Sequence, residues 1–171
     1  MTPDQIYFEH KKMVFNLALQ YVQNIEDAEE ITQDVFLKVF DNLGSFKKQS
    51  NIKTWIYRIS INQSLDFIKS KKSRKKSFLS SIFSLNDTKF HFEAANFNHP
   101  GIELEQKEAY QKIFSAINQL SDNQKTAIIL LKIENKSREE AAEIMNLNVK
   151  ALESLFHRAK NNLEILLIKK G

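Results

Sequence analysis

Cysteine is absent from this chain of 171 residues, so disulfide bonds and thiolate metal sites are both excluded. With only 3 Gly and 2 Pro, the sequence has little material for tight turns and favours long helices over sheets. A glycine-rich phosphate-binding loop is nearly excluded for the same reason. The four histidines do not have the spacing of metal ligands: His10, His91, His99 and His157.

Other absences limit the location and the class of function. No apolar run approaches the roughly 20 residues of a membrane span, and the N-terminus has no signal-peptide core. No paired-carboxylate, Ser/His/Asp or metal-binding constellation is evident. The sequence therefore predicts a cytoplasmic protein that is not an enzyme, does not insert into the membrane, and needs no cofactor, metal or small-molecule substrate.

The charge of the chain is unevenly distributed. Its net charge is only +4, but residues 47–76 contain ten lysines and arginines against the single acid Asp66. Residues 26–34, in contrast, contain five acids and no base. A basic stretch this dense is typical of phosphate binding, although a solvated lysine-rich helix end has the same composition.

Helical periodicity predicts three helices in the first half of the chain. Thr2 and Gln5 form a capping box with Pro3 at the first helical position, which predicts a helix from Pro3 to about Val22. Apolar spacing predicts a second helix over 26–43, stopped by Gly44, and a third over 54–72 after a polar loop at 45–53.

The second half is also helical, beyond a stretch without sustained periodicity. Residues 73–103 are rich in Ser, Asn and Lys and predict a linker, within which 80–85 could form a short helical turn. Helices are expected over 102–120 and 123–134, the second with a capping box at Ser121 and Gln124. The predicted fold is all-α, with two small helical domains, residues 1–73 and 104–171, joined by a flexible linker at 74–103.

Residues 137–160 predict a helix-turn-helix. Ser137 and Glu140 form a capping box, Asn146 suits the left-handed turn, Leu147 is expected to point inward, and Asn148 can cap the second helix. That helix has a stripe of apolar residues near period 3.6 at Leu152, Phe156, Ala159 and Leu163. Its opposite face presents donors suited to DNA at Lys150, Ser154, His157, Arg158 and Asn161. An ordinary helical hairpin with a solvated polar face remains the alternative on pattern alone.

Three long segments carry a resemblance to a known family. They are NIEDAEEITQDVFLKVFDNLGSF at 24–46, NIKTWIYRISINQSLDFIKSKKSRK at 51–75 and LSDNQKTAIILLKIENKSREEAAEIMNLNVKALESLFHRAKNNL at 120–163. Together they resemble bacterial RNA polymerase sigma factors of the extracytoplasmic-function type, which belong to the sigma-70 family. The resemblance covers almost the whole chain, because both domains and the intervening linker occur in the order of the family.

The resemblance implies roles for the first domain. It implies that the acidic helix binds the clamp coiled coil of core RNA polymerase through Asp27, Glu30, Gln33 and Asp34. Phe36, on the same helix, is interpreted as core. It implies that the loop and third helix bind and open the minus-ten promoter element through Lys47, Lys48, Ser50, Asn51, Lys53, Thr54, Trp55, Arg58 and Asn62. Trp55 is interpreted as an anchor between loop and helix rather than as a base-stacking residue.

The resemblance also implies that the helix-turn-helix contacts the minus-thirty-five element in duplex form. The implied positions are Lys150, Glu153, Ser154, His157, Arg158 and Asn161. Glu153 and Leu155 stand where the family often has Lys or Arg, and Asn135 and Asn146 replace usual glycines. Fewer cations imply a more modest phosphate affinity, and Glu153 could either accept from a cytosine amino group or repel phosphate.

The expected partners follow from the same family: core RNA polymerase, promoter DNA and an anti-sigma factor. The expected function is promoter-specific transcription initiation. One alternative is a helix-turn-helix regulator that binds operator DNA without polymerase, although no dimerisation surface is evident for a two-fold site. A second alternative is a helical scaffold whose basic segment only increases solubility.

Overall fold

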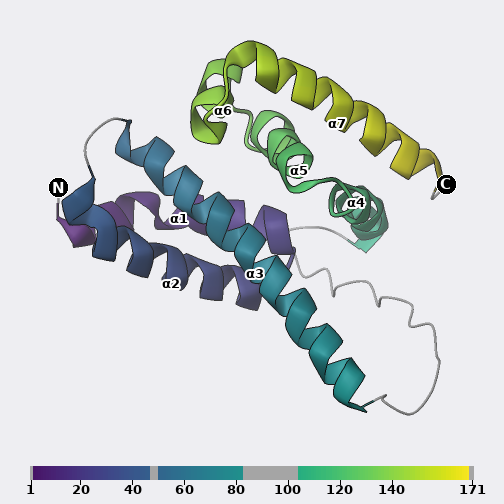
Figure 1. The fold of residues 1–171 in the computed structure, drawn as a ribbon, viewed down its shortest axis with the longest axis horizontal. Helices are drawn as coiled ribbons and strands as arrows, with labels where there is room; N and C mark the ends of the chain where they lie inside the picture. Colours follow the sequence, from purple (N-terminus) through teal and green to yellow (C-terminus); the bar gives the residue numbers. More distant parts are fainter. Residues whose placement is uncertain (1, 47–49, 83–103, 170–171) are drawn as a thin grey trace.

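A computed structural model describes residues 2–46, 50–82 and 104–169 of the chain, and within these ranges it contains helices and turns but no strand. The all-α fold class is therefore confirmed (Figure 1). The helices are α1 (Pro3–Val22), α2 (Ile25–Asn42), α3 (Ile52–Ile82), α4 (Leu104–Ile117), α5 (Asp122–Ile128), α6 (Arg138–Met145) and α7 (Val149–Lys169). A 3-10 turn, η1 (Leu43–Ser45), follows α2, and a π-helical segment, η2 (Ile129–Ile133), continues α5.

The N-terminal group of helices begins as the sequence predicts. The capping box at Thr2 and Gln5 is present, and α1 has the predicted bounds. Its apolar residues Ile6, Val14 and Leu17 have no exposed surface, and α1 packs against α2 and α3. Phe36 is buried as well, as the interpretation of it as core requires.

Helix α3 is longer than the sequence predicts. It was expected to end near Lys72 but continues to Ile82, past the ends of α1 and α2 (Figure 1). Residues 69–78 are all exposed, so this part of the helix has no buried stripe and hydrophobic periodicity could not identify it. The absence of Gly and Pro from its sequence allows it to continue. Most of the predicted linker, residues 83–103, lies outside the described residues.

The helix-turn-helix is confirmed in the C-terminal group. Ser137 and Glu140 form both hydrogen bonds of the capping box, and Asn146 ends α6 in the left-handed conformation with φ 54°. The Asn148 side chain accepts a hydrogen bond from the backbone N–H of Ala151 at 2.7 Å, which caps the start of α7.

Two details of this group correct the sequence-based expectations. Leu147 does not point inward, because 38% of its surface is exposed. The expected capping box at Ser121 forms only in part. Ser121 accepts from the backbone of Gln124, but the Gln124 side chain accepts from Asn162 of α7 at 3.2 Å.

The two groups of helices pack against each other in a way that the sequence did not indicate. One continuous apolar core extends from Ile6 in α1 to Leu152 in α7 and includes Ile129 and Leu130 of η2, both fully buried. Helix α3, which belongs to the N-terminal group, contacts α6 across this junction. The domain boundaries at 73 and 104 remain predictions.

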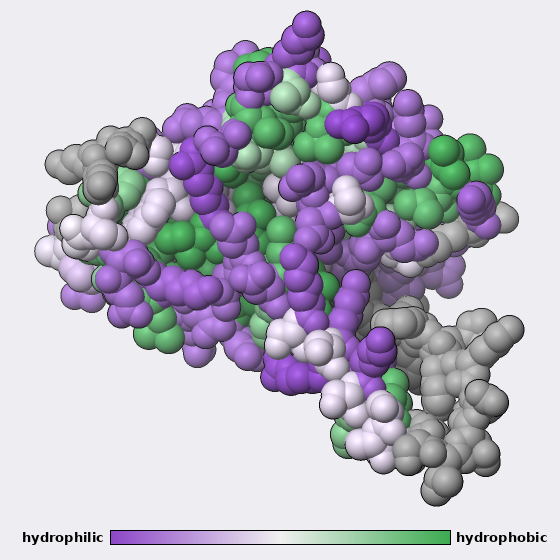
Figure 2. All heavy atoms as spheres, in the orientation of Figure 1, coloured by the Kyte–Doolittle hydropathy of each residue, from purple (hydrophilic) through white to green (hydrophobic). Residues whose placement is uncertain are grey.

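Hydrophilic side chains cover most of the face drawn in Figure 2. Apolar surface gathers at its right-hand edge, towards the C-terminal end of α7, where Ile165 and Ile168 are half and 78% exposed. No helix among the described residues is both long enough and apolar enough to cross a membrane.

Candidate nucleic-acid interface

Four of the predicted minus-ten residues line one cavity. Ser50, Trp55, Arg58 and Asn62 surround a space of about 440 Å³ where the 3-10 turn η1 meets the first three turns of α3. Its volume lies in the roughly 300–1,000 Å³ range of pockets that hold small organic groups. The wall is mostly polar, and its hydroxyl, amide and guanidinium groups can hydrogen-bond the edge of an extruded nucleobase.

Trp55 is held by the turn opposite it. Its ring lies half-buried with its centroid 4.9 Å from that of Phe46, at an interplanar angle of 35°. This contact supports the interpretation of Trp55 as an anchor between loop and helix. Because Trp55 also lines the cavity, its contact with Phe46 holds one wall of the cavity in place.

The remaining minus-ten residues surround the start of α3. The side-chain oxygen of Asn51 accepts from the backbone N–H of Lys53 at 2.9 Å, so Asn51 satisfies a donor at the helix start. Lys53 is exposed and Thr54 is half-buried, and neither lines the cavity. Lys47 and Lys48 lie outside the described residues.

Five residues that sequence reasoning did not assign to the site also line the cavity: Lys38, Asn42, Ser45, Phe46 and Ile59. Lys38 and Asn42 are one turn apart on α2, and the Asn42 side chain donates to the Lys38 carbonyl at 2.8 Å. Their signal in the sequence was weak, because polar residues at this spacing occur on any exposed helix face.

Arg58 makes contacts that the sequence could not reveal. Its Nη2 donates to the carbonyl of Glu143 at 2.6 Å and its Nε to the carbonyl of Ile144 at 3.2 Å. Both acceptors belong to the last turn of α6, the first helix of the helix-turn-helix. In the structure Arg58 therefore joins the two groups of helices, and its contact with promoter DNA stays a prediction.

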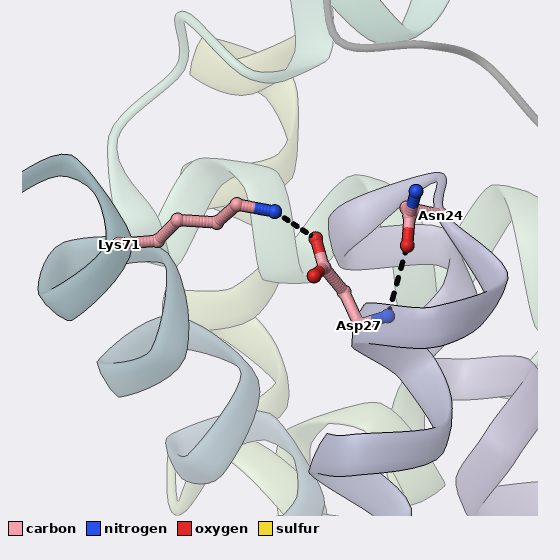
Figure 3. A network of polar contacts seen from close by, with 3 residues as sticks. All are labelled: Asn24, Asp27 and Lys71. Carbon is pink, nitrogen blue, oxygen red and sulfur yellow. Dashed lines mark hydrogen bonds and ion pairs between the residues drawn. The ribbon is translucent and has the colours of Figure 1, made fainter. Parts of the chain in front are cut away.

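The predicted polymerase-binding residues share one face of α2 but differ in their exposure and in their contacts with α3. Glu30 and Gln33 are exposed. Asp34 is half-buried and accepts from Gln63 of α3 at 2.9 Å. The side chain of Asp27 is only 17% exposed and pairs with Lys71 of α3, while its backbone N–H donates to Asn24 (Figure 3). Two of the four are therefore held by α3.

The predicted minus-thirty-five residues all lie exposed along α7: Lys150, Glu153, Ser154, His157, Arg158 and Asn161. Beneath them Leu152 and Ala159 are fully buried, whereas Phe156 and Leu163 are half-buried. The predicted division of α7 into an apolar and a polar face is confirmed. A polar helix face that projects from a helix-turn-helix can enter the major groove of DNA.

Glu153 has an ion-pair partner within the helix-turn-helix. Its Oε1 lies 3.1 Å from Nη1 of Arg138, at the start of α6. The pair borders a hollow of about 350 Å³ between α6 and α7. While this pair is formed, the charge of Glu153 is balanced, which lowers its repulsion of phosphate. No group of three or more potential metal ligands lies together among the described residues.

Comparisons with known proteins identify both halves. The Sigma-70 region 2 family model matches residues 6–74, and the Sigma-70 region 4 model matches residues 110–163. The chain is 29% identical to RNA polymerase sigma factor SigV of Bacillus subtilis, over 94% of this chain and 88% of that protein. It is 28% identical to the ECF RNA polymerase sigma-E factor of Haemophilus influenzae, over 91% of this chain and 82% of that one.

Solved structures show the same similarity. The sigma factor RpoE in complex with the anti-sigma factor NepR, from Bartonella quintana, superposes with a TM-score of 0.61 at 26% identity. That match covers 96% of this chain and 95% of the other. CnrH, in complex with the cytosolic domain of CnrY, has the same fold, with a TM-score of 0.66 at 21% identity over 99% of this chain and 89% of CnrH.

Proposed function

Since this chain belongs to the sigma-70 family, as an extracytoplasmic-function member, we propose that it binds core RNA polymerase and directs initiation at specific promoters. In this function the N-terminal helices bind polymerase and open the minus-ten element. The helix-turn-helix binds the minus-thirty-five element as duplex. A protein with this function acts in the cytoplasm and catalyses no reaction of its own.

The observation that carries this proposal is the cavity at the start of α3. Ser50, Trp55 and Asn62 come from a loop and from separate turns of one helix, yet they line the same space. Opening a duplex costs a few kcal/mol per unstacked step, and a preformed polar pocket for one extruded base offsets part of that cost. An operator-binding regulator has no need of such a pocket, because it contacts closed duplex.

The surface of α2 supports a polymerase partner. Glu30 and Gln33 are exposed on a helix whose inward side, including Ile31 and Val35, is fully buried. An exposed acid such as Glu30 on a rigid helix suits a basic partner, because complementary potentials steer association and suppress wrong partners.

We also propose an anti-sigma factor as a regulatory partner. The support is indirect: RpoE of Bartonella quintana, with the same fold over nearly its whole length, forms a complex with an anti-sigma factor.

Reconstitution tests the proposed function. The chain is added to core RNA polymerase with genomic DNA, and the 5′ ends of the transcripts are sequenced. The expected result is a set of starts that share a minus-ten and a minus-thirty-five element and that require the chain. Binding of the chain alone to specific duplex sites, with no polymerase association, would favour the operator-binding alternative.

A further inference from the structure

The outward face of α7 carries little positive charge for a helix that is proposed to bind DNA. Its six predicted minus-thirty-five residues include the cations Lys150 and Arg158 against the acid Glu153. A large share of the affinity of proteins for duplex DNA comes from neutralised phosphates, so this balance is a weak basis for tight binding. Cations that border the face are therefore candidates for further contacts with DNA.

The hollow between α6 and α7 lies beside this face. Two of the predicted residues, Glu153 and His157, line it, and so does Lys160, which the sequence did not single out. These three residues follow one another at intervals of four and three along α7, so they form one edge of the outward face. The hollow is also lined by three apolar side chains: Leu131, Leu152 and Phe156.

Two lysines lie over the ring of Phe156. The Nζ atom of Lys132, in η2, is 5.7 Å from the ring centroid, and that of Lys160 is 5.9 Å from it. An ammonium group at this distance is attracted by the face of an aromatic ring. Because both nitrogen atoms lie within about 6 Å of one centroid, they are at most about 12 Å apart. The shared ring thus holds two exposed positive charges beside the hollow.

The acid at the hollow does not cancel these two charges. Of the residues that line the hollow, Glu153 is the one acid, and its Oε1 lies 3.1 Å from Nη1 of Arg138. The carboxylate therefore has a cationic partner of its own. Lys132 and Lys160 add two positive charges to this edge of α7.

The position of Lys160 along α7 suits the DNA backbone better than the bases. Helices of this motif contact base edges with their N-terminal residues. Lys160 is ten residues after Lys150, about 15 Å along the helix at 1.5 Å per residue. The major groove is only about 8.5 Å deep and about 12 Å wide. When Lys150 is near the bases, Lys160 therefore lies at the rim of the groove, where the phosphates are.

We propose that Lys132 and Lys160 bind phosphates of one DNA strand at the edge of the major groove that α7 enters. This inference rests on the proposed function and deepens it. A length of about 12 Å contains three or four phosphates of one strand, at about 3.4 Å per phosphate along the duplex axis. Phe156 acts as a positioning residue, because its ring holds the two lysines. Phosphate contacts fix the orientation of the helix and are independent of base sequence.

The salt dependence of binding tests the proposal. The complex of the chain with core polymerase is titrated with a fluorescent duplex from a promoter found by the reconstitution. This duplex contains the minus-thirty-five element and ends before the minus-ten element. Wild type is compared at several salt concentrations with Lys132→Gln/Lys160→Gln. The matched control, Lys112→Gln/Lys169→Gln, removes the same charge from exposed positions on α4 and at the far end of α7.

The expected result is a fall of about two in the slope of log affinity against log salt concentration for Lys132→Gln/Lys160→Gln. The control pair should keep the wild-type slope, and so should Lys132→Arg/Lys160→Arg, which retains both charges. The base preference selected from randomised DNA should be the same for all of these variants. Both lysines are exposed, so thermal unfolding should also be unchanged.

An unchanged slope for Lys132→Gln/Lys160→Gln would overturn the proposal, and so would an equal fall for the control pair. A loss of affinity for core polymerase with an unchanged slope on DNA would also overturn it, and would assign the two lysines to an acidic protein surface. If the wild-type chain with core polymerase does not bind the duplex at all, the proposed function itself is wrong. In the other outcomes the wild-type complex binds, so the two failures are distinguishable.

Discussion

Lys125 is a buried cation whose charge is opposed by its surroundings. Its side chain is only 5% exposed, and its Nζ donates to Asn118 at 2.7 Å and to the Tyr21 carbonyl. Burial lowers the pKa of Lys125 to about 8, with repulsion from Lys72 in the same direction and attraction to Asp122 against it. The lysine is thus placed where neutral and charged forms are close in free energy near physiological pH.

This pKa predicts a rise of stability with pH. Between about pH 8 and the unfolded value of 10.5, the unfolded chain binds more protons at this site than the folded one, so the free energy of unfolding increases as pH rises. We expect a gain of roughly 1–2 kcal/mol between pH 7.5 and 9.5. Urea unfolding of the wild-type chain and of Lys125→Met measures it. The gain should be absent from the variant, and equal gains in both would contradict the assignment to Lys125.

Asn62 is expected to act in strand opening. It is exposed at the edge of the minus-ten cavity, and no capping contact depends on it. Asn62→Ala should therefore reduce open-complex formation on duplex promoter more than on a template with a pre-melted bubble, with stability changed by no more than about 0.5 kcal/mol. Asn51 is a less suitable test, because its side chain caps α3. Equal losses on the two templates would mean that Asn62 supplies general DNA affinity only.

At the scale of elements, the acidic face of α2 contains one residue that is exposed and another that is hydrogen-bonded to α3. Glu30 is exposed, whereas Asp34 is tied to Gln63 of α3, so reversal of Asp34 perturbs packing as well as charge. We predict that Glu30→Lys lowers affinity for core polymerase by about tenfold in competition with another sigma factor. Glu9→Lys is the matched control, with the same change of charge at an exposed position on a different helix, α1. Similar losses for both variants would indicate a net-charge effect instead of a binding surface.

Helix α7 carries a charge pair that should influence the predicted base preference. Arg138→Ala removes the partner of Glu153 and leaves its carboxylate free near the N-terminal end of α7. We expect a shifted minus-thirty-five preference and weaker duplex binding, because an unbalanced carboxylate repels phosphate. Selection from randomised upstream DNA measures the preference, and an unchanged consensus for Arg138→Ala would place the base contacts elsewhere.

Arg158→Ala should instead weaken binding to all DNA sequences alike. It should also reduce the slope of log affinity against log salt concentration by about one.

Local sequence signals predicted the elements more completely than they predicted the site. Capping residues such as Thr2, Ser137 and Asn148 act on their own backbone within three residues, so the sequence determines these helix ends directly. The contacts of Arg58 span more than eighty residues of sequence, and no local pattern encodes them. The exposed end of α3, residues 69–78, has no buried apolar stripe, so hydrophobic periodicity does not mark it either. The sequence was sufficient to assign polar residues to the outer faces of helices, but it did not identify their partners in the other group of helices.

For the whole molecule, the shared core of the two groups of helices predicts a compact free chain. A globular chain of this length has a radius of gyration of about 16 Å, and the projecting end of α3 should raise it only modestly. We expect small-angle scattering of the free chain to give roughly 16–20 Å. The double variant Arg58→Glu/Lys125→Glu places acids at two helix C-termini and should increase the radius measurably. A large radius for the wild-type chain would show that the halves move independently in solution.

In the turn after α1, the backbone conformation favours glycine, but a contact between the two groups of helices requires a side chain. Gln23 adopts the left-handed conformation, with φ 49°, where an L side chain costs roughly 1–2 kcal/mol and glycine costs nothing. Yet its side chain accepts the hydrogen bond from Asn118. Glycine at this position would relax the turn and at the same time remove one link between the halves. A search for more heat-resistant variants of the N-terminal half alone would therefore select against Gln23, and the chain that resulted would hold its two groups of helices together less firmly.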